Sequence, residues 1–143
     1  MVIPCRKTFL AALLALSSAL CLLPMLSGCA SSDNSNLGIK ALLDHFSANG
    51  IKITEIGLLR ADAAHAEFGM TATIEGRQIG IYKYDLTKKR QREFLERIQE
   101  RGFFGIAGHK FEADNFAVNG TFIMIDFKDN PKGKQLLELF KDF

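Results

Sequence analysis

Cysteine, histidine and tryptophan are rare or missing in this chain of 143 residues. It contains three cysteines, three histidines and no tryptophan. The cysteines are Cys5, Cys21 and Cys29, so all of them precede residue 30. A disulfide needs two cysteines and a thiolate metal site needs several, so neither is expected in the rest of the chain.

Sequence patterns of known catalytic nucleophiles are missing as well. The chain has neither a Gly-x-Ser-x-Gly elbow nor a Ser-x-x-Lys pair. The nearest approach to a metal site is Asp62 with His65 and Glu67, and a second is the segment 109–114, which an extended strand would divide over two faces. His45 lies between apolar neighbours of a helical pattern, which is typical of a boundary histidine. We therefore expect no catalytic residue, no metal ligand and no cofactor.

The N-terminal segment has the order of a bacterial export signal. Arg6 and Lys7 precede an apolar run from Phe9 to about Leu26, and no acidic residue occurs before Asp33. A charged start, an apolar core and an exit of small residues are what a secretion signal requires. About 18 to 20 apolar residues also suffice for a membrane-spanning helix, which is the alternative interpretation of the same run.

The end of this run resembles the lipobox of bacterial lipoproteins. The motif is Leu26-Ser27-Gly28-Cys29, and Ala30 follows it. The resemblance implies cleavage before Cys29 and acylation of that residue with more than one chain. Anchoring is then stable, since each buried methylene contributes about 0.8 kcal/mol. In enterobacterial lipoproteins a residue other than aspartate after the cysteine favours the outer membrane. We therefore expect an envelope protein that is held by lipid and faces the periplasm.

Loss of the signal would change the charge balance. The chain has 18 Lys and Arg against 16 Asp and Glu, and only Arg6 and Lys7 among them precede Cys29. The mature chain would thus carry 16 charges of each sign, and no nucleic-acid partner is expected for it. The densest basic run, 88–92, is either the solvated first turn of a helix or a contact for lipid phosphates, at about 1 kcal/mol per basic residue.

The chain divides into three predicted parts. These are a signal peptide at 1–28, the lipidated cysteine with a flexible polar tether at 29–38, and one domain at 39–143. Helical spacing of apolar residues predicts helices at 39–49, from a cap at Thr87 to about residue 101, and over the last ten residues. Strand-like segments lie between these helices.

Two tight turns and an internal match suggest the arrangement of the strands. Turns are predicted at Glu75-Gly76 and Asn119-Gly120, which separate apolar runs. A spacing of 44 residues matches the two turns and their flanks, either through duplication of an α-β-β unit or through similar patterning of unrelated units. The predicted fold class is α+β, with a mostly antiparallel sheet and helices packed on one face.

One face of this sheet is predicted to be open to a partner. If the isoleucines of 79–81 and 123–125 face the helices, their neighbours point the other way. These neighbours are Tyr82, Tyr84, Phe122 and Met124. Such a face, left uncovered, is apolar enough to bind a protein or an envelope component. We therefore predict a non-enzymatic membrane-anchored lipoprotein. The alternatives are a carrier of a small molecule or lipid between sheet and helices, and an enzyme with an unrecognised site.

Overall fold

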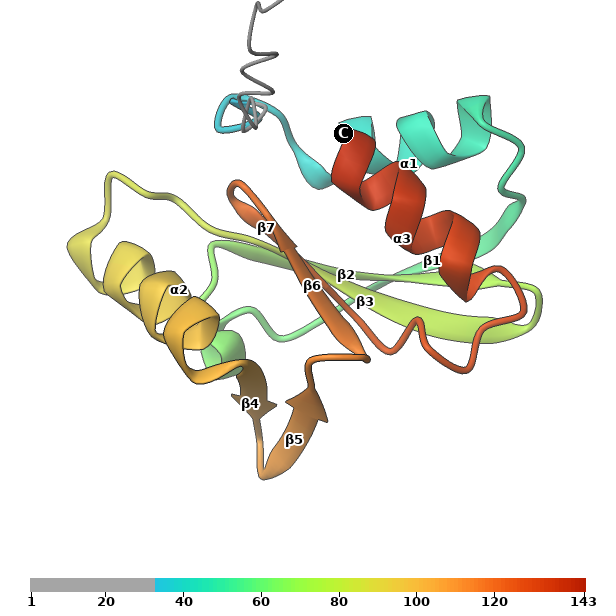
Figure 1. The fold of residues 1–143 in the computed structure, drawn as a ribbon. Coiled ribbons are helices and arrows are strands. Elements are labelled where there is room, and N and C mark those ends of the chain that lie inside the picture. Colours follow the sequence, from blue (N-terminus) through green and yellow to red (C-terminus); the bar gives the residue numbers. More distant parts are fainter. Residues whose placement is uncertain (1–32) are drawn as a thin grey trace, which may run out of the picture. The chain divides into compact units, whose positions relative to one another are not determined.

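The fold is built around a five-stranded antiparallel sheet (Figure 1). The computed structural model describes residues 33–143. The strands of the sheet are β1 (Ile53–Leu58), β2 (Phe68–Ile74), β3 (Arg77–Lys83), β6 (Phe116–Asn119) and β7 (Phe122–Ile125). The remaining elements are α1 (Ile39–Ala48), α2 (Lys89–Arg101), α3 (Gly133–Asp142), the 3-10 turn η1 (Asp62–Ala64) and a small hairpin of β4 (Phe103–Ile106) and β5 (His109–Glu112). The predicted α+β class is confirmed.

Strands β3 and β7 lie at the centre of the sheet, whose order is β1-β2-β3-β7-β6. All four residues of β7 and the last five residues of β3 are buried. A strand that is covered on both faces needs apolar residues at consecutive positions, and the segments IGIY and FIMI supply them. The central strands are therefore suited to a sheet with a core on each side.

Helices occupy both faces of the sheet, and the prediction that they pack on one face is wrong. Helices α1 and α3 cover one face, where Phe46 and Phe140 pack against Phe122. Helix α2 and strand β4 cover the other face, where Phe104 belongs to the same cluster as Ile123. Successive residues of a strand point to opposite faces, so Phe122 and Ile123 belong to different cores.

Both predicted hairpins form, and one of them turns a residue later than predicted. Glu75 and Gly76 have φ values of 49° and 73°, the pattern of a type I′ turn. In the second hairpin Asn119 still pairs with Phe122, so the turn residues are Gly120 and Thr121. The side chain of Asn119 donates a hydrogen bond to the main-chain oxygen of Phe140 at 2.7 Å, which joins this end of β6 to α3.

The sequence match at a spacing of 44 residues does not correspond to a repeated structural unit. Ile74 pairs with Arg77 in the first hairpin and Asn119 with Phe122 in the second, so the hairpins correspond at a spacing of 45 residues. A shift of one residue moves every side chain to the other face. Accordingly Ile81 lies under α1 and α3, whereas its match Ile125 lies under α2.

Candidate functional site

The residues predicted to bind a partner are buried and do not share a face. Tyr82 and Tyr84 belong to the core beneath α2, and Phe122 and Met124 belong to the core beneath α1 and α3. Each is at most 2% exposed. The register between β3 and β7 pairs Ile81 with Met124, which separates the predicted set. The expected open sheet face is therefore wrong, and Cys29, the predicted lipidation site, lies outside the described residues.

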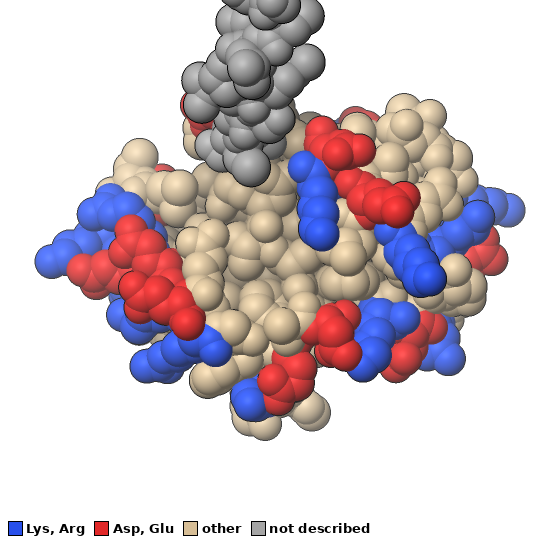
Figure 2. All heavy atoms as spheres, in the orientation of Figure 1, with Lys and Arg blue, Asp and Glu red and all other residues tan. Residues whose placement is uncertain are grey.

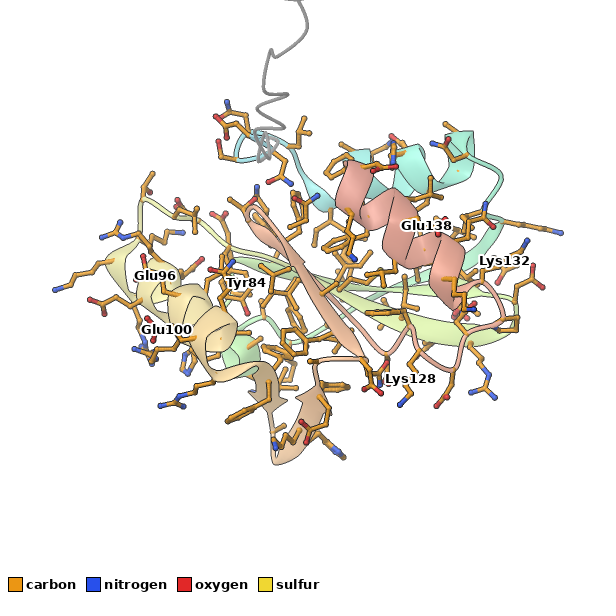
Figure 3. The ribbon with its side chains drawn as sticks, in the orientation of Figure 1. Tyr84, Glu96, Glu100, Lys128, Lys132 and Glu138 are labelled. Carbon is orange, nitrogen blue, oxygen red and sulfur yellow. The ribbon has the colours of Figure 1, made fainter. Side chains whose placement is uncertain are left out.

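Tyr84 has a structural role inside the core beneath α2. Its side chain lies between α2 and the sheet (Figure 3), and its hydroxyl donates a hydrogen bond to the main-chain oxygen of Ala64 at 2.9 Å. The ring stacks on Phe94 with centroids 6.2 Å apart. Burial raises the pKa of the Tyr84 phenol well above its usual value. The hydroxyl therefore stays protonated and anchors the loop that contains η1.

A fixed attachment point joins the predicted tether to the sheet. Asn34 is only 1% exposed, although it precedes the first helix. Its side-chain amide donates to the main-chain oxygen of Asn119 at 3.2 Å, and its side-chain oxygen accepts from the main-chain N–H of Thr121 at 3.1 Å. These bonds replace the partners that a buried amide would otherwise find in water. Asn34 and Ser35 are thus bonded to the domain, within the segment 29–38 that the sequence predicts to be a flexible tether.

Lys83 completes this attachment point from the end of β3. Its ammonium donates to the main-chain oxygens of Asn34 at 3.2 Å and Ser35 at 2.9 Å, and to the hydroxyl of Thr121. It also lies 4.3 Å from the centroid of the Phe122 ring. Burial lowers the pKa of Lys83, while the charges of Glu67 and other nearby carboxylates oppose this effect. An ammonium has three donors, and all three are used here, so Lys83 positions the chain.

Gly120 allows Asn34 to approach so closely. A Cβ atom at this position would lie 2.2 Å from the side-chain oxygen of Asn34. The residue also has a φ of 56°, which glycine adopts without strain. We call the set of Asn34, Lys83, Asn119, Gly120 and Thr121 the tether dock. The turn at Asn119-Gly120 was predicted, but its contacts with Asn34 and Lys83 were not, although a single lysine within the apolar segment IGIYKY is a signal that a partner is required.

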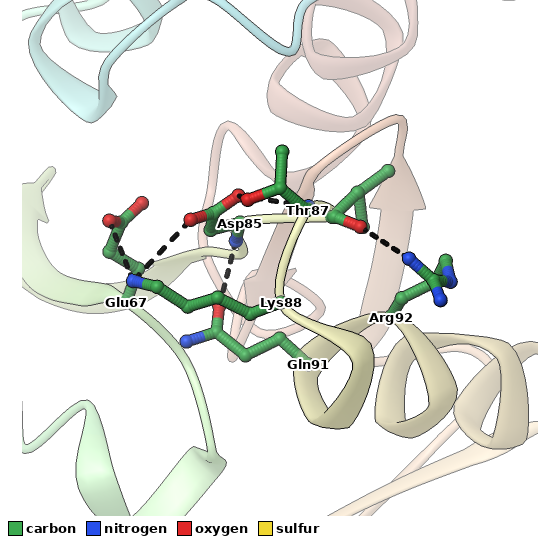
Figure 4. Close-up of polar contacts among 7 residues, drawn as sticks. Glu67, Asp85, Thr87, Lys88, Gln91 and Arg92 are labelled. Atoms are coloured by element: carbon green, nitrogen blue, oxygen red, sulfur yellow. Dashed lines mark hydrogen bonds and ion pairs between the residues drawn. The ribbon is translucent and has the colours of Figure 1, made fainter.

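A groove of about 360 Å³ lies beside the tether dock. Two of its lining residues, Glu67 and Asp85, contact Lys88 at 3.2 Å and 3.4 Å (Figure 4). Hydrogen bonds from Thr87 lower the pKa of Asp85, and the bond to Glu67 raises the pKa of Lys88. The main-chain N–H of Asp85 donates to the side-chain oxygen of Gln91 at 2.7 Å. These contacts fix the start of α2, and the two acidic side chains that line the groove both contact Lys88.

The basic run of α2 is also engaged within the domain. Lys89 contacts Glu93 at 3.6 Å, and the guanidinium of Arg92 donates to the main-chain oxygen of Leu86 at 2.8 Å. Figure 2 shows acidic and basic side chains intermixed at the sides of this face, with an uncharged area between them. The arrangement favours a solvated helix turn over a dedicated site for lipid phosphates.

The histidines and carboxylates do not converge on a metal site. Within residues 33–143 no group of three or more potential ligands is placed to hold a metal ion. Asp62 pairs with Arg60 at 2.8 Å, and the ring of His65 packs edge-on against Phe94. The Nε2 atom of His45 lies 3.0 Å from the main-chain oxygen of Leu139, which ties α1 to α3. Each of these side chains has a structural contact.

Comparison with known proteins does not assign the chain to a family. No family model matches the chain, and neither a curated protein nor a solved structure matches it. Over the part of the chain that the structure describes, no helix is both long and apolar enough to span a bilayer.

Proposed function

We propose that this chain is a lipid-anchored, non-enzymatic module of the bacterial cell envelope. The observation that carries the proposal is the spacing between the lipobox motif and the tether dock. Cys29, the proposed acylated residue, lies only five positions before Asn34, which is the first buried residue within 33–143. A lipid at Cys29 would thus be joined to the sheet by a very short connection. Ala30 supports an outer-membrane location.

The engagement of polar groups supports a non-enzymatic role. Lys83 uses its three donors in the tether dock, and Lys88 forms ion pairs with both Glu67 and Asp85. General acid–base catalysis needs a group within hydrogen-bond reach of the substrate. The polar clusters described above instead stabilise the start of α2 and the attachment of the tether.

Contacts with the envelope would use a different surface from the buried sheet faces. The large apolar side chains that are exposed within residues 33–143 are Leu37, Ile56, Leu58 and Phe68. The carrier hypothesis gains no comparable support, since side chains such as Phe46 and Phe122 fill the space between sheet and helices. We therefore develop only the first proposal.

Metabolic labelling with a clickable fatty acid tests the anchor. In a bacterial host the wild-type chain should incorporate the label and remain with the membranes after a salt wash. Cys29→Ser should lose both properties. Cys21→Ser is the matched control, because it removes a cysteine from the same segment, and it should be labelled like the wild type. Equal labelling of Cys29→Ser and the wild type would refute the proposal.

A further inference from the structure

Exposed apolar side chains gather at one corner of the sheet. Leu58 is 89% exposed, Phe68 62% and Ile56 53%. We call these three residues the apolar corner. Leu58 pairs with Met70 and Ile56 with Ala72, and Phe68 is two residues before Met70 on β2. Paired residues share a face, as do residues two apart on one strand, so all three side chains lie on the face that α1 and α3 cover elsewhere.

The apolar corner adjoins the tether dock. Phe68 on β2 is the direct partner of Lys83 on β3, and Lys83 holds Asn34 and Ser35. Antiparallel partners have Cα atoms about 5 Å apart, so Phe68 is next to the attachment point. Leu58 lies one strand further out. In Figure 1 the segment that contains Asn34 lies above the end of the sheet where β2 begins and β3 ends.

The connection between lipid and domain is short in comparison with the domain. Five residues from Cys29 to Asn34 span about 17 Å when fully extended. A domain of the size of residues 39–143 has a radius of gyration of about 13 Å, which corresponds to a diameter of about 33 Å. If Cys29 is acylated, the connection reaches only about half that diameter and would keep the side with the tether dock close to the headgroups.

We infer that the apolar corner inserts into the interfacial region of the lipid bilayer that holds the anchor, so that the domain sits on the membrane in one orientation. The inference rests on the proposed acylation of Cys29. Tethering raises the effective concentration of the surface at the bilayer, so a few apolar side chains suffice for contact. A free domain with the same surface would bind vesicles only weakly.

Charges near the corner are compatible with this contact. Glu67, beside Phe68, is paired with Lys88, and Asp62 is paired with Arg60. The mature chain would carry equal numbers of acidic and basic residues. Binding to the bilayer is therefore driven by the burial of apolar side chains and not by attraction between a basic surface and anionic lipid. Binding should persist on vesicles of phosphatidylcholine and at high salt.

Quenching by spin-labelled lipid tests the orientation. The acylated full-length protein is reconstituted into phosphatidylcholine vesicles, with a fluorophore on Arg60→Cys, two residues from Leu58. The matched control has the fluorophore on Glu100→Cys, at an exposed position on α2 (Figure 3). Quenching should be several-fold stronger at position 60 than at position 100. Adding Leu58→Ser and Phe68→Ser to the Arg60→Cys protein should reduce quenching several-fold without lowering its melting temperature.

Each outcome decides the inference. Equal quenching at the two positions would show that the domain has no preferred orientation, and unchanged quenching in the double serine variant would show that the corner does not insert. Either result overturns the inference. If the fluorophore at position 60 were shielded from solvent in native envelopes but not in vesicles of pure lipid, a protein partner would cover the corner. That result would also overturn the inference. Flotation of the vesicles reports separately on the anchor, since a chain without lipid would not float.

Discussion

The ammonium of Lys83 lies 3.2 Å from the main-chain oxygen of Asn34, and this contact joins the centre of the sheet to the start of the described chain. Burying a charged amine is costly unless its donors are satisfied. Here the compensation comes from the chain that leads toward Cys29. The same contact therefore satisfies a buried ammonium of the sheet and attaches the segment that leads toward Cys29.

Replacement of Lys83 by methionine should release the tether. Lys83→Met leaves the oxygens of Asn34 and Ser35 without their donor, at a cost of about 1–3 kcal/mol in the free energy of unfolding. Hydrogen exchange of residues 33–38 should accelerate at least about tenfold, which corresponds to about 1.4 kcal/mol. The Leu37 amide, which donates to the oxygen of Asn34 at 3.0 Å, is a direct reporter. Unchanged protection of this amide, or an equal effect of Lys52→Met at an exposed position, would contradict the prediction.

Alanine at position 120 should displace Asn34. In Gly120→Ala the new methyl group would overlap the side-chain oxygen of Asn34, in addition to the strain of a positive φ. Gly76→Ala is a matched control, because Gly76 has a φ of 73° in the other hairpin but no neighbour within 4 Å. The control should lose about 1–2 kcal/mol from backbone strain alone. Chemical denaturation should show a larger loss for Gly120→Ala, and equal losses would argue against the close contact.

Stability should fall in alkaline solution because of Tyr84. Burial raises the pKa of this phenol in the folded state, whereas an unfolded tyrosine titrates near about pH 10. Above that pH the unfolded chain has lost the proton that the folded chain retains, so the free energy of unfolding decreases as pH rises. In Tyr84→Phe this decrease should be shallower, with a loss of about 1 kcal/mol at neutral pH from the missing hydrogen bond. An identical alkaline decrease in wild type and variant would disagree with this role.

The residue after the lipidated cysteine should direct the membrane location. In an enterobacterial host Ala30→Asp should move the protein from outer-membrane to inner-membrane fractions on a density gradient. Ala30→Ser, a neutral substitution at the same position, should leave the distribution unchanged. An outer-membrane location for both variants would mean that the residue at position 30 does not control sorting.

Local sequence patterns predicted most of the elements. Helical spacing predicted α1 and α3, and Glu75-Gly76 predicted the first hairpin, because these features depend on residues close together in the chain. The faces of the sheet could not be predicted in the same way. In β3 and β7 consecutive residues are apolar, so neither face of the strand is marked by polar side chains. The alternation of side chains along the strand alone could therefore not assign Tyr82 or Phe122 to a face. The register between the two strands decided it.

The tether dock depends on contacts between distant residues. Asn34 and Thr121 are 87 positions apart, and the polar segment that contains Asn34 has the composition of a linker. The segment that contains Asn34 becomes part of the domain only because the turn of the second hairpin and Lys83 lie close together in the fold. A buried lysine in a central strand was the one signal available in the sequence, and it indicates a need for partners without naming them.

Intact mass spectrometry of the protein extracted from bacterial membranes tests the central claim most directly. The account predicts a mature chain that begins at Cys29 and carries the mass of a diacylglycerol together with a further acyl chain. A chain that retains Met1, or one that begins at Cys29 without added lipid, would contradict it.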